Sequence, residues 1–312
     1  MNTITPLVSY NFAIAKVLAI LLVATGHFFN GFHLWIPVTI GLFTFAWSSA
    51  LFSTLKHSNQ VNVIAFWRNK LKRLGLRFLL IQVFLFALVV LQGRDGLFTW
   101  QTLLHFTGQS GWINWFGIHN ASPLGSGLWF FTLLLLFYLA FPILVRWQQN
   151  TLVSSVITLV TVVAAWWLSR TFDVGHALWI TATAFVLGIH CAWHPLPGSA
   201  KFWLALAIAA ALAMGFLNVG PGIRAANPAL IILCALAAVQ WLEKTSLTLP
   251  AGPLASLTPC VLEIYLIHTY LFMGTNWPRP LAYLTSMAAI IAVALVLNFL
   301  ITQLENHLVR QS

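Results

Sequence analysis

The sequence predicts an all-α protein that crosses a membrane about ten times, and three observations support this prediction. Hydrophobic residues make up 60% of the 312-residue chain, and charged residues make up only 6%, whereas about a quarter of the residues in soluble domains are charged. Apolar stretches of about twenty residues, long enough to cross a bilayer as helices, recur along the whole chain. The period-two alternation that is typical of membrane β-barrels is absent.

The predicted spans follow one another without an internal repeat or a soluble domain between them. They are expected at Ser9–Asn30, Ile36–Leu55, Leu74–Gln92, Leu128–Trp147, Leu152–Leu168, His176–Trp193, Phe202–Leu217, Pro228–Leu242, Leu257–Met273 and Leu281–Leu304. No Lys or Arg precedes the first span and no Ala-x-Ala site follows it, so we expect it to be retained rather than cleaved as a signal peptide. We therefore expect residues 1–312 to form a single transmembrane domain.

The positive charge of the chain predicts its orientation. Fifteen Lys and Arg residues against five Asp and Glu residues give a net charge of +10, and most of the excess lies between Lys56 and Arg77. Basic loops remain on the cytoplasmic side, so this loop and both termini are predicted to be cytoplasmic. In a membrane protein such charge indicates contact with lipid, not with nucleic acid. The three cysteines have no metal-type spacing and are interpreted as packing residues.

Two ionisable residues stand out in the first span, Lys16 and His27. Ionisable side chains within a membrane are costly and are candidates for function. Eleven residues are about three helical turns, so both side chains lie near one face, roughly 16 Å apart along the axis. His27 is either a general base or an interfacial histidine that hydrogen-bonds to a neighbouring helix. Lys16 anchors an anionic ligand from the cytosol, pairs with an acidic residue, or extends to the lipid headgroups.

The basic segment contains Arg68, Lys72 and Arg73, which we expect near one face of a helix. Three such cations can hold a phosphate-bearing ligand at the membrane surface. The alternative is that they only set the topology and contact anionic lipid.

Glu263 and His268 lie within the ninth predicted span. We expect Glu263 to pair with a cation, for example Lys16, because an unpaired buried carboxylate would be neutral. The sequence contains no metal-ligand spacing, no phosphate-binding loop and no dinucleotide fingerprint, and no Gly-x-Ser-x-Gly elbow. No metal and no bound cofactor are therefore predicted.

Taken together, these stretches resemble the acyltransferase-3 family of integral-membrane acyltransferases. Lys16-x10-His27 is similar to the family's [Arg/Lys]-x10-His motif in the first span. The other matching stretches follow in the family's order: Ser48 to Leu55 with the basic segment Phe66–Arg77, Leu128-Trp-Phe-Phe…Phe-Tyr-Leu-Ala-Phe-Pro142, and Tyr265-Leu-Ile-His268. The chain departs from the pattern at Thr132, where many members have Glu or Arg nearby, and at Glu263, where a small polar residue is more usual. We expect a stand-alone member without the extracytoplasmic domain that some members carry.

The resemblance implies a multi-pass enzyme of the bacterial inner membrane that moves an acyl group, most often acetyl, from cytosolic acyl-CoA to a hydroxyl of a glycan or glycolipid. His27 would deprotonate that hydroxyl or carry the acyl group transiently. The expected donor-binding residues are Lys16, Arg68, Lys72 and Arg73, and the expected supporting or substrate residues are Glu263, His268, Trp129, Tyr138 and Ser48. The alternative is a transporter or flippase for a lipid-linked sugar, although the inverted repeats and matched helix breaks common in that class are not visible.

Overall fold

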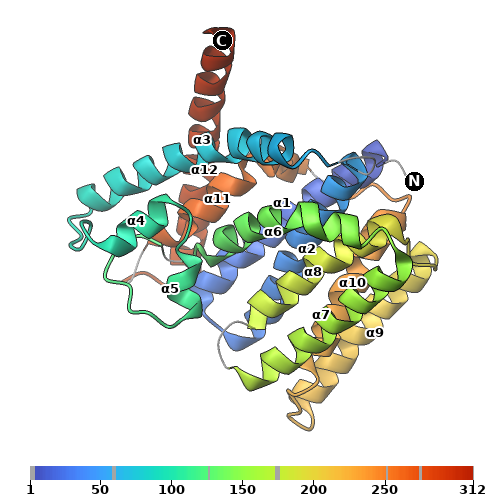
Figure 1. The fold of residues 1–312 in the computed structure, drawn as a ribbon. Coiled ribbons are helices and arrows are strands. Elements are labelled where there is room, and N and C mark those ends of the chain that lie inside the picture. The colour runs from blue at the N-terminus through green and yellow to red at the C-terminus, as the bar shows by residue number, and fades with distance from the viewer. Residues whose placement is uncertain are drawn as a thin grey trace. The chain divides into compact units, whose positions relative to one another are not determined.

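The computed structural model describes residues 4–57, 61–125, 127–172, 176–250, 252–273 and 276–311. In these residues the chain forms twelve α-helices and two 3₁₀-helices and no strand (Figure 1). The helices are α1 (Pro6–Phe29), α2 (Phe32–Lys56), α3 (Val63–Leu91), α4 (Trp100–Phe106), α5 (Gly111–Trp115), α6 (Trp129–Trp147), α7 (Thr151–Thr171), α8 (His176–Trp193), α9 (Ala200–Val219), α10 (Asn227–Lys244), η1 (Gly252–Cys260), α11 (Val261–Ile267), η2 (His268–Tyr270) and α12 (Arg279–Gln311). The predicted all-α class is confirmed.

Seven helices in the described part of the chain are long and apolar enough to cross a membrane. They are Pro6–Phe29, Leu34–Lys56, Val63–Leu91, Trp129–Trp147, Thr151–Thr171, Ala200–Val219 and Arg279–His307, and a shorter apolar helix covers Ala177–Trp193. The protein is therefore a polytopic helical membrane protein. The total of ten spans and the cytoplasmic location of both termini stay predictions.

The basic segment is helical, and it is continuous with the third predicted span, which was expected to begin only at Leu74. α3 begins at Val63 and carries the basic residues in its first half, which fits the good helix propensity of Arg, Lys and Leu. Arg68 and Lys72 are about one turn apart on this helix. Arg73 follows Arg68 by five residues and is turned by about 140° from it, at about 100° per residue. The expectation that all three cations share one face is therefore wrong.

The ninth predicted span is divided into three pieces instead of one helix: η1, the seven-residue α11, and η2. Proline has no backbone N–H and obstructs the preceding helical turn. Pro259 lies near the end of η1, and the α-helical part begins two residues after it. The irregular backbone places Glu263 and His268 in a short segment with tight turns on both sides.

The helices cluster into two compact units. Unit 1 comprises Met1–Ala19, Phe32–Asn62 and Leu136–Ala251. Within it α8 packs between α2 and α7, and α9 packs along α10 (Figure 1). A Cβ atom at Gly188 would lie 2.7 Å from the carbonyl oxygen of Trp47, so glycine allows α8 to approach the α2 backbone closely.

Unit 2 comprises Ile20–Gly31, Val63–Leu135 and Gly252–Ser312. Here α11 packs against η1, α3 and α12, and the short helices α4 and α5 lie in the connection from α3 to α6 (Figure 1). Helices α1 and α6 each contribute one part to each unit. The residues discussed below as a candidate site all belong to unit 2.

Thr132 links the connection between α4 and α5 to the start of α6 through two hydrogen bonds. Its hydroxyl donates to the carbonyl oxygen of Gly108 and accepts from the N–H of Gly111, both at 2.8 Å. The preceding residue, Phe131, stacks on Phe78 of α3 with 4.2 Å between ring centres. Thr132, one of the departures from the family pattern, thus has a structural role in this chain.

The end of α1 is held by defined contacts. Asn30 adopts a left-handed conformation with φ of 48°, and its N–H donates to the carbonyl oxygen of Gly26 at 2.9 Å, as is common where a helix ends. The hydroxyls of Thr25 and Tyr283 are 2.8 Å apart, and Arg279 donates to the carbonyl oxygen of Phe29 at 3.1 Å. These contacts to α12 fix the last turn of α1, which carries His27.

Candidate functional site

Two histidines from distant parts of the chain lie side by side in unit 2. His27 is in the last turn of α1 and His268 begins η2. Their ring centres are 5.1 Å apart and the ring planes are tilted by 51°. His27 is half-buried, whereas His268 has 0% of its surface exposed. Part of the His27 surface is therefore accessible, whereas the His268 surface is not.

The backbone holds the ring of His268 in one orientation. Its Nδ1 is 2.7 Å from the carbonyl oxygen of Tyr265. A carbonyl can only accept a hydrogen bond, so in the neutral ring Nδ1 carries the proton and Nε2 carries the lone pair. Nε2 is buried and has no hydrogen-bond partner in the described residues. We call His27 and His268 the two-histidine site.

The turn that enters α6 forms one wall of this site. Gly125 and Gly127 have positive φ angles of 89° and 75°, which residues other than glycine rarely adopt. A Cβ atom at Gly127 would lie 3.7 Å from both Cε1 and Nε2 of His27 and 3.2 Å from Cγ2 of Thr269. Glycine therefore brings the backbone of this turn against the edge of the His27 ring.

Two tyrosines from the late motif region hold this turn in place. The hydroxyl of Tyr265 donates to the carbonyl oxygen of Gly127 at 2.8 Å and accepts from the N–H of Phe131 at 3.3 Å. The hydroxyl of Tyr270 accepts from the N–H of Gly125 at 2.6 Å. Tyr265 thus connects the α6 turn, through its hydroxyl, to His268, through its carbonyl oxygen.

His105 of α4 lies beneath the same turn. A Cβ atom at Gly125 would overlap the His105 ring, and Nε2 of His105 is 3.4 Å from Oδ1 of Asn120. Burial lowers the pKa of His105, and the contact with Asn120 opposes this only in part. His105 is therefore neutral at neutral pH and supports the turn by packing. Protonation at acidic pH would oppose folding, so its contribution to stability is lost as the pH falls below about 6.5.

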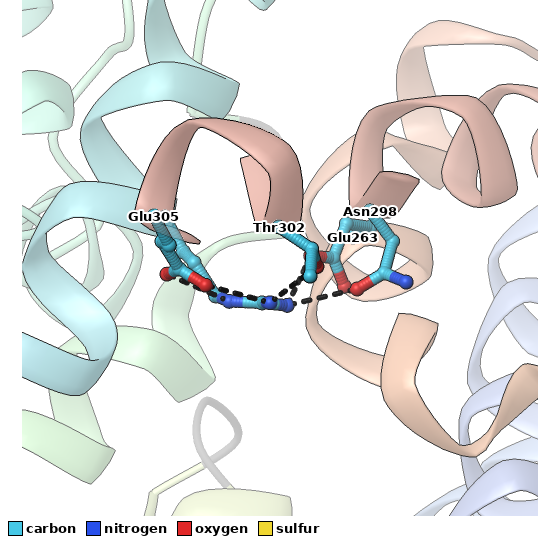
Figure 2. A network of polar contacts seen from close by, with 5 residues as sticks. Glu263, Asn298, Thr302 and Glu305 are labelled. Atoms are coloured by element: carbon cyan, nitrogen blue, oxygen red, sulfur yellow. Dashed lines mark hydrogen bonds and ion pairs between the residues drawn. The ribbon is translucent and has the colours of Figure 1, made fainter. Parts of the chain in front are cut away.

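Arg77 binds four acceptors from two other elements of unit 2 (Figure 2). Its Nε and Nη2 donate to the two carboxylate oxygens of Glu305, at 3.1 and 3.0 Å. Nη1 donates to Glu263 at 3.0 Å and to Asn298 at 2.9 Å, and Nη2 donates to Thr302 at 3.1 Å. All five N–H groups of the guanidinium are used, so Arg77 joins α3 to α11 and α12.

Glu263 pairs with a cation as expected, but the cation is Arg77 and not Lys16. The Glu263 side chain has 0% of its surface exposed, and the Arg77 side chain has 20%. α3 packs directly against α11 and therefore supplies the nearest cation. Lys16 belongs to unit 1, where its ammonium lies 5.3 Å from the centre of the Phe52 ring.

The remaining predicted site residues are distributed over both units. Ser48 and Tyr138 belong to unit 1. The Ser48 hydroxyl donates to the carbonyl oxygen of Phe45 at 3.1 Å, and the Tyr138 hydroxyl is 3.2 Å from that of Ser49. Trp129 is the first residue of α6 and contacts Phe130 edge-on, with 6.1 Å between ring centres. Three basic residues of α3 are exposed to solvent or lipid: Arg68, Lys72 and Arg73.

Sequence reasoning missed the structural roles of Arg77, Tyr265 and Tyr270. Arg77 was counted only as part of the basic segment, yet an arginine at a membrane span needs carboxylate partners. A buried tyrosine needs a partner for its hydroxyl, and that requirement could have directed attention to Tyr265 and Tyr270. Their partners are backbone groups of the α6 turn, which a sequence pattern does not reveal.

The two-histidine site has the chemical groups for proton transfer. A half-buried imidazole that is backed by a second, buried imidazole can accept a proton from a hydroxyl at neutral pH. Among the described residues, no group of three or more His, Cys, Asp or Glu side chains could hold a metal ion. The two imidazoles support general-base chemistry on a substrate that contacts His27.

The comparisons with known proteins identify the family of the chain. The sequence matches the acyltransferase domain of the acyltransferase-3 family over residues 9–302. No curated protein and no solved structure matches the chain. Because the matched region covers nearly the whole chain, and the fold is a helical membrane fold, the protein belongs to the acyltransferase-3 family of membrane acyltransferases.

Proposed function

We propose that the protein is a membrane O-acetyltransferase of the bacterial inner membrane, which transfers the acetyl group of cytosolic acetyl-CoA to a hydroxyl of a glycan or glycolipid. The observation that carries this proposal is the contact of His27 with His268 and the Gly127 turn. It supports a general-base role for a partly exposed histidine in a chain that belongs to an acyltransferase family.

In the proposed reaction His27 accepts the proton of the acceptor hydroxyl. The oxygen attacks the carbonyl carbon of the thioester, and the new C–O ester bond forms as the C–S bond breaks. The leaving thiolate of coenzyme A takes up the proton that His27 had accepted, so His27 returns to its neutral form. Lys16 and the exposed cations of α3, Arg68, Lys72 and Arg73, are proposed to attract the anionic donor.

The test is acetyl transfer by the purified protein in lipid nanodiscs, with radiolabelled acetyl-CoA and a panel of bacterial surface glycans as acceptors. We expect labelled ester on the glycan, and we expect His27→Ala to lower kcat by about 10²–10⁴-fold, the usual contribution of a general base. His119→Ala is the matched control, because His119 is exposed and has no proposed role. Normal transfer by folded His27→Ala would refute the assignment of His27.

The same assay distinguishes an acyltransferase from a transporter or flippase. A transporter or flippase would move a lipid-linked sugar without forming an acetyl ester. Mass spectrometry of the surface glycans, from cells with and without the protein, then identifies the acceptor. The acetyl ester should be lost from one glycan class in the absence of the protein, and it should return with wild-type protein but not with His27→Ala.

A further inference from the structure

His268 uses one of its ring nitrogens in a hydrogen bond, whereas the other has no hydrogen-bond partner in the described residues. Nδ1 donates to the Tyr265 carbonyl oxygen at 2.7 Å, which leaves Nε2 as a hydrogen-bond acceptor. Nε2 is fully buried, and within the described residues it has no donor. A buried acceptor without a donor costs free energy, and each such group in a native structure requires an explanation.

The ring of His27 is suited to provide the missing donor. The two ring centres are 5.1 Å apart, which is about the separation of two imidazoles joined by an N–H···N bond of about 2.9 Å. Because Nε2 has no donor in the described residues, the proposed bond requires the His27 ring, which is tilted by 51° to that of His268, to rotate and bring an N–H to Nε2. The Gly127 backbone and the Thr269 side chain line the same space.

Burial also argues that His268 is not itself the base. Protonation of Nε2 would place a positive charge in a site with no exposed surface, and burying an unpaired charge is costly. The partner of Nδ1 is a neutral carbonyl oxygen and offers no counter-charge. His268 is therefore suited to act as a neutral acceptor.

We propose that His268 is a positioning residue that fixes the tautomer of His27. Its Nε2 accepts an N–H from His27, so the other nitrogen of His27 keeps its lone pair and faces the acceptor hydroxyl. A base that is oriented by a third group is a recurrent arrangement in catalysis. This inference rests on the proposed function of His27 as a base, but the tautomer of His27 can be measured without any activity.

The test is ¹⁵N NMR of the full-length protein, labelled on its histidines and reconstituted in bilayers. Comparison with His27→Gln identifies the signals of His27, and the ¹⁵N shifts distinguish the two tautomers. We expect one tautomer of His27 in the wild type and in His268→Gln, whose amide oxygen can accept the same N–H. In His268→Phe, which has no acceptor, we expect both tautomers. An unchanged single tautomer in His268→Phe would overturn the proposal.

The wild-type spectrum is a second test that does not depend on whether His268→Phe folds. It must show His268 with its proton on Nδ1 and His27 as a single tautomer; an equal mixture of tautomers at His27 overturns the proposal. In the transfer assay, kcat of His268→Phe should fall by about tenfold to a hundredfold while KM for acetyl-CoA stays unchanged, and His268→Gln should recover most of the loss. If the wild type transfers no acetyl group, the proposed function fails, but the NMR result still decides the tautomer.

Discussion

Lys16 carries its charge inside an apolar helix, and its ammonium lies 5.3 Å from the centre of the Phe52 ring. A cation over an aromatic face gains about 0.5–1 kcal/mol at an exposed site. That gain is smaller than the cost of placing lysine in a span, which is about 2.5–3.5 kcal/mol at the helix centre. The ring contact alone therefore offsets only part of this cost.

Replacing Lys16 tests whether this residue binds the acyl donor. We expect Lys16→Ala to weaken acetyl-CoA binding by about 10–100-fold, because a hydrogen bond to a charged group contributes about 1.5–3 kcal/mol. Lys16→Arg keeps the charge and should bind acetyl-CoA nearly as the wild type does. Binding can be measured by scintillation proximity with radiolabelled acetyl-CoA.

Lys201→Ala is the matched control for this measurement, because Lys201 is exposed at the start of α9. The same affinity in the wild type, Lys16→Ala and Lys16→Arg would contradict a role in donor binding. The side chain would then be one that reaches the lipid headgroups.

At the scale of the helices, the Arg77 cluster joins three elements of unit 2 (Figure 2). Glu263 lies five residues before His268, within the short segment that follows η1. By holding α11 against α3 and α12, the ion pair supports the backbone that positions His268. The cluster thus has a structural role next to the two-histidine site.

Removing Arg77 should destabilise the protein strongly. Arg77→Met leaves Glu263 fully buried without its cation, and breaking a buried pair typically costs about 3–5 kcal/mol. The double variant Arg77→Met/Glu263→Met removes both charges and should lose much less stability. The measurement is the apparent Tm in detergent, followed by the fluorescence of the native tryptophans.

Arg73→Ala provides the control for the Arg77 experiment, since Arg73 is exposed on the same helix and its Tm should stay near that of the wild type. A wild-type Tm for Arg77→Met would show that the cluster contributes nothing to stability. A double variant less stable than Arg77→Met would contradict the argument from buried charge.

The sequence predicts most of the helices well, because the apolar character of a segment is enough to identify it as a membrane helix. α8 spans His176–Trp193, the range expected from the sequence, and α1, α2 and α6 differ from their expected ranges by at most a few residues. The break in the helix at Pro259 was not anticipated, because the stretch is apolar and long enough for one span. The proline within it interrupts the regular helical backbone. Local pattern also did not show that the basic segment continues into α3 as one helix.

Contacts between helices were harder to predict than the helices themselves. The pattern drew attention to His27 and His268 separately, but helical spacing relates only residues of one helix. Their contact, like that of Glu263 with Arg77, depends on how unit 2 packs. The Lys16–Glu263 pair suggested by composition was wrong because the choice of partner is decided by packing and not by charge alone.

At the scale of the whole molecule, the excess of Lys and Arg over Asp and Glu is concentrated in one segment. The first half of α3 presents Arg68, Lys72 and Arg73 at its surface, which favours the cytoplasmic side of the membrane. An acyl-CoA donor is anionic and cytosolic, so the same charges that orient the chain are also suited to attract its donor. The direction of the proposed acetyl transfer therefore depends on this orientation.

Cysteine labelling tests the orientation directly. The native cysteines at positions 191, 234 and 260 are all buried, so a cysteine introduced at an exposed position should dominate the reaction with a membrane-impermeant maleimide. We expect Arg94→Cys, exposed after α3, to react in intact spheroplasts. We expect Arg68→Cys to react only after the membrane is opened. Labelling in the reverse order would place the α3 cations outside the cell, and a cytosolic anionic donor could then not reach them.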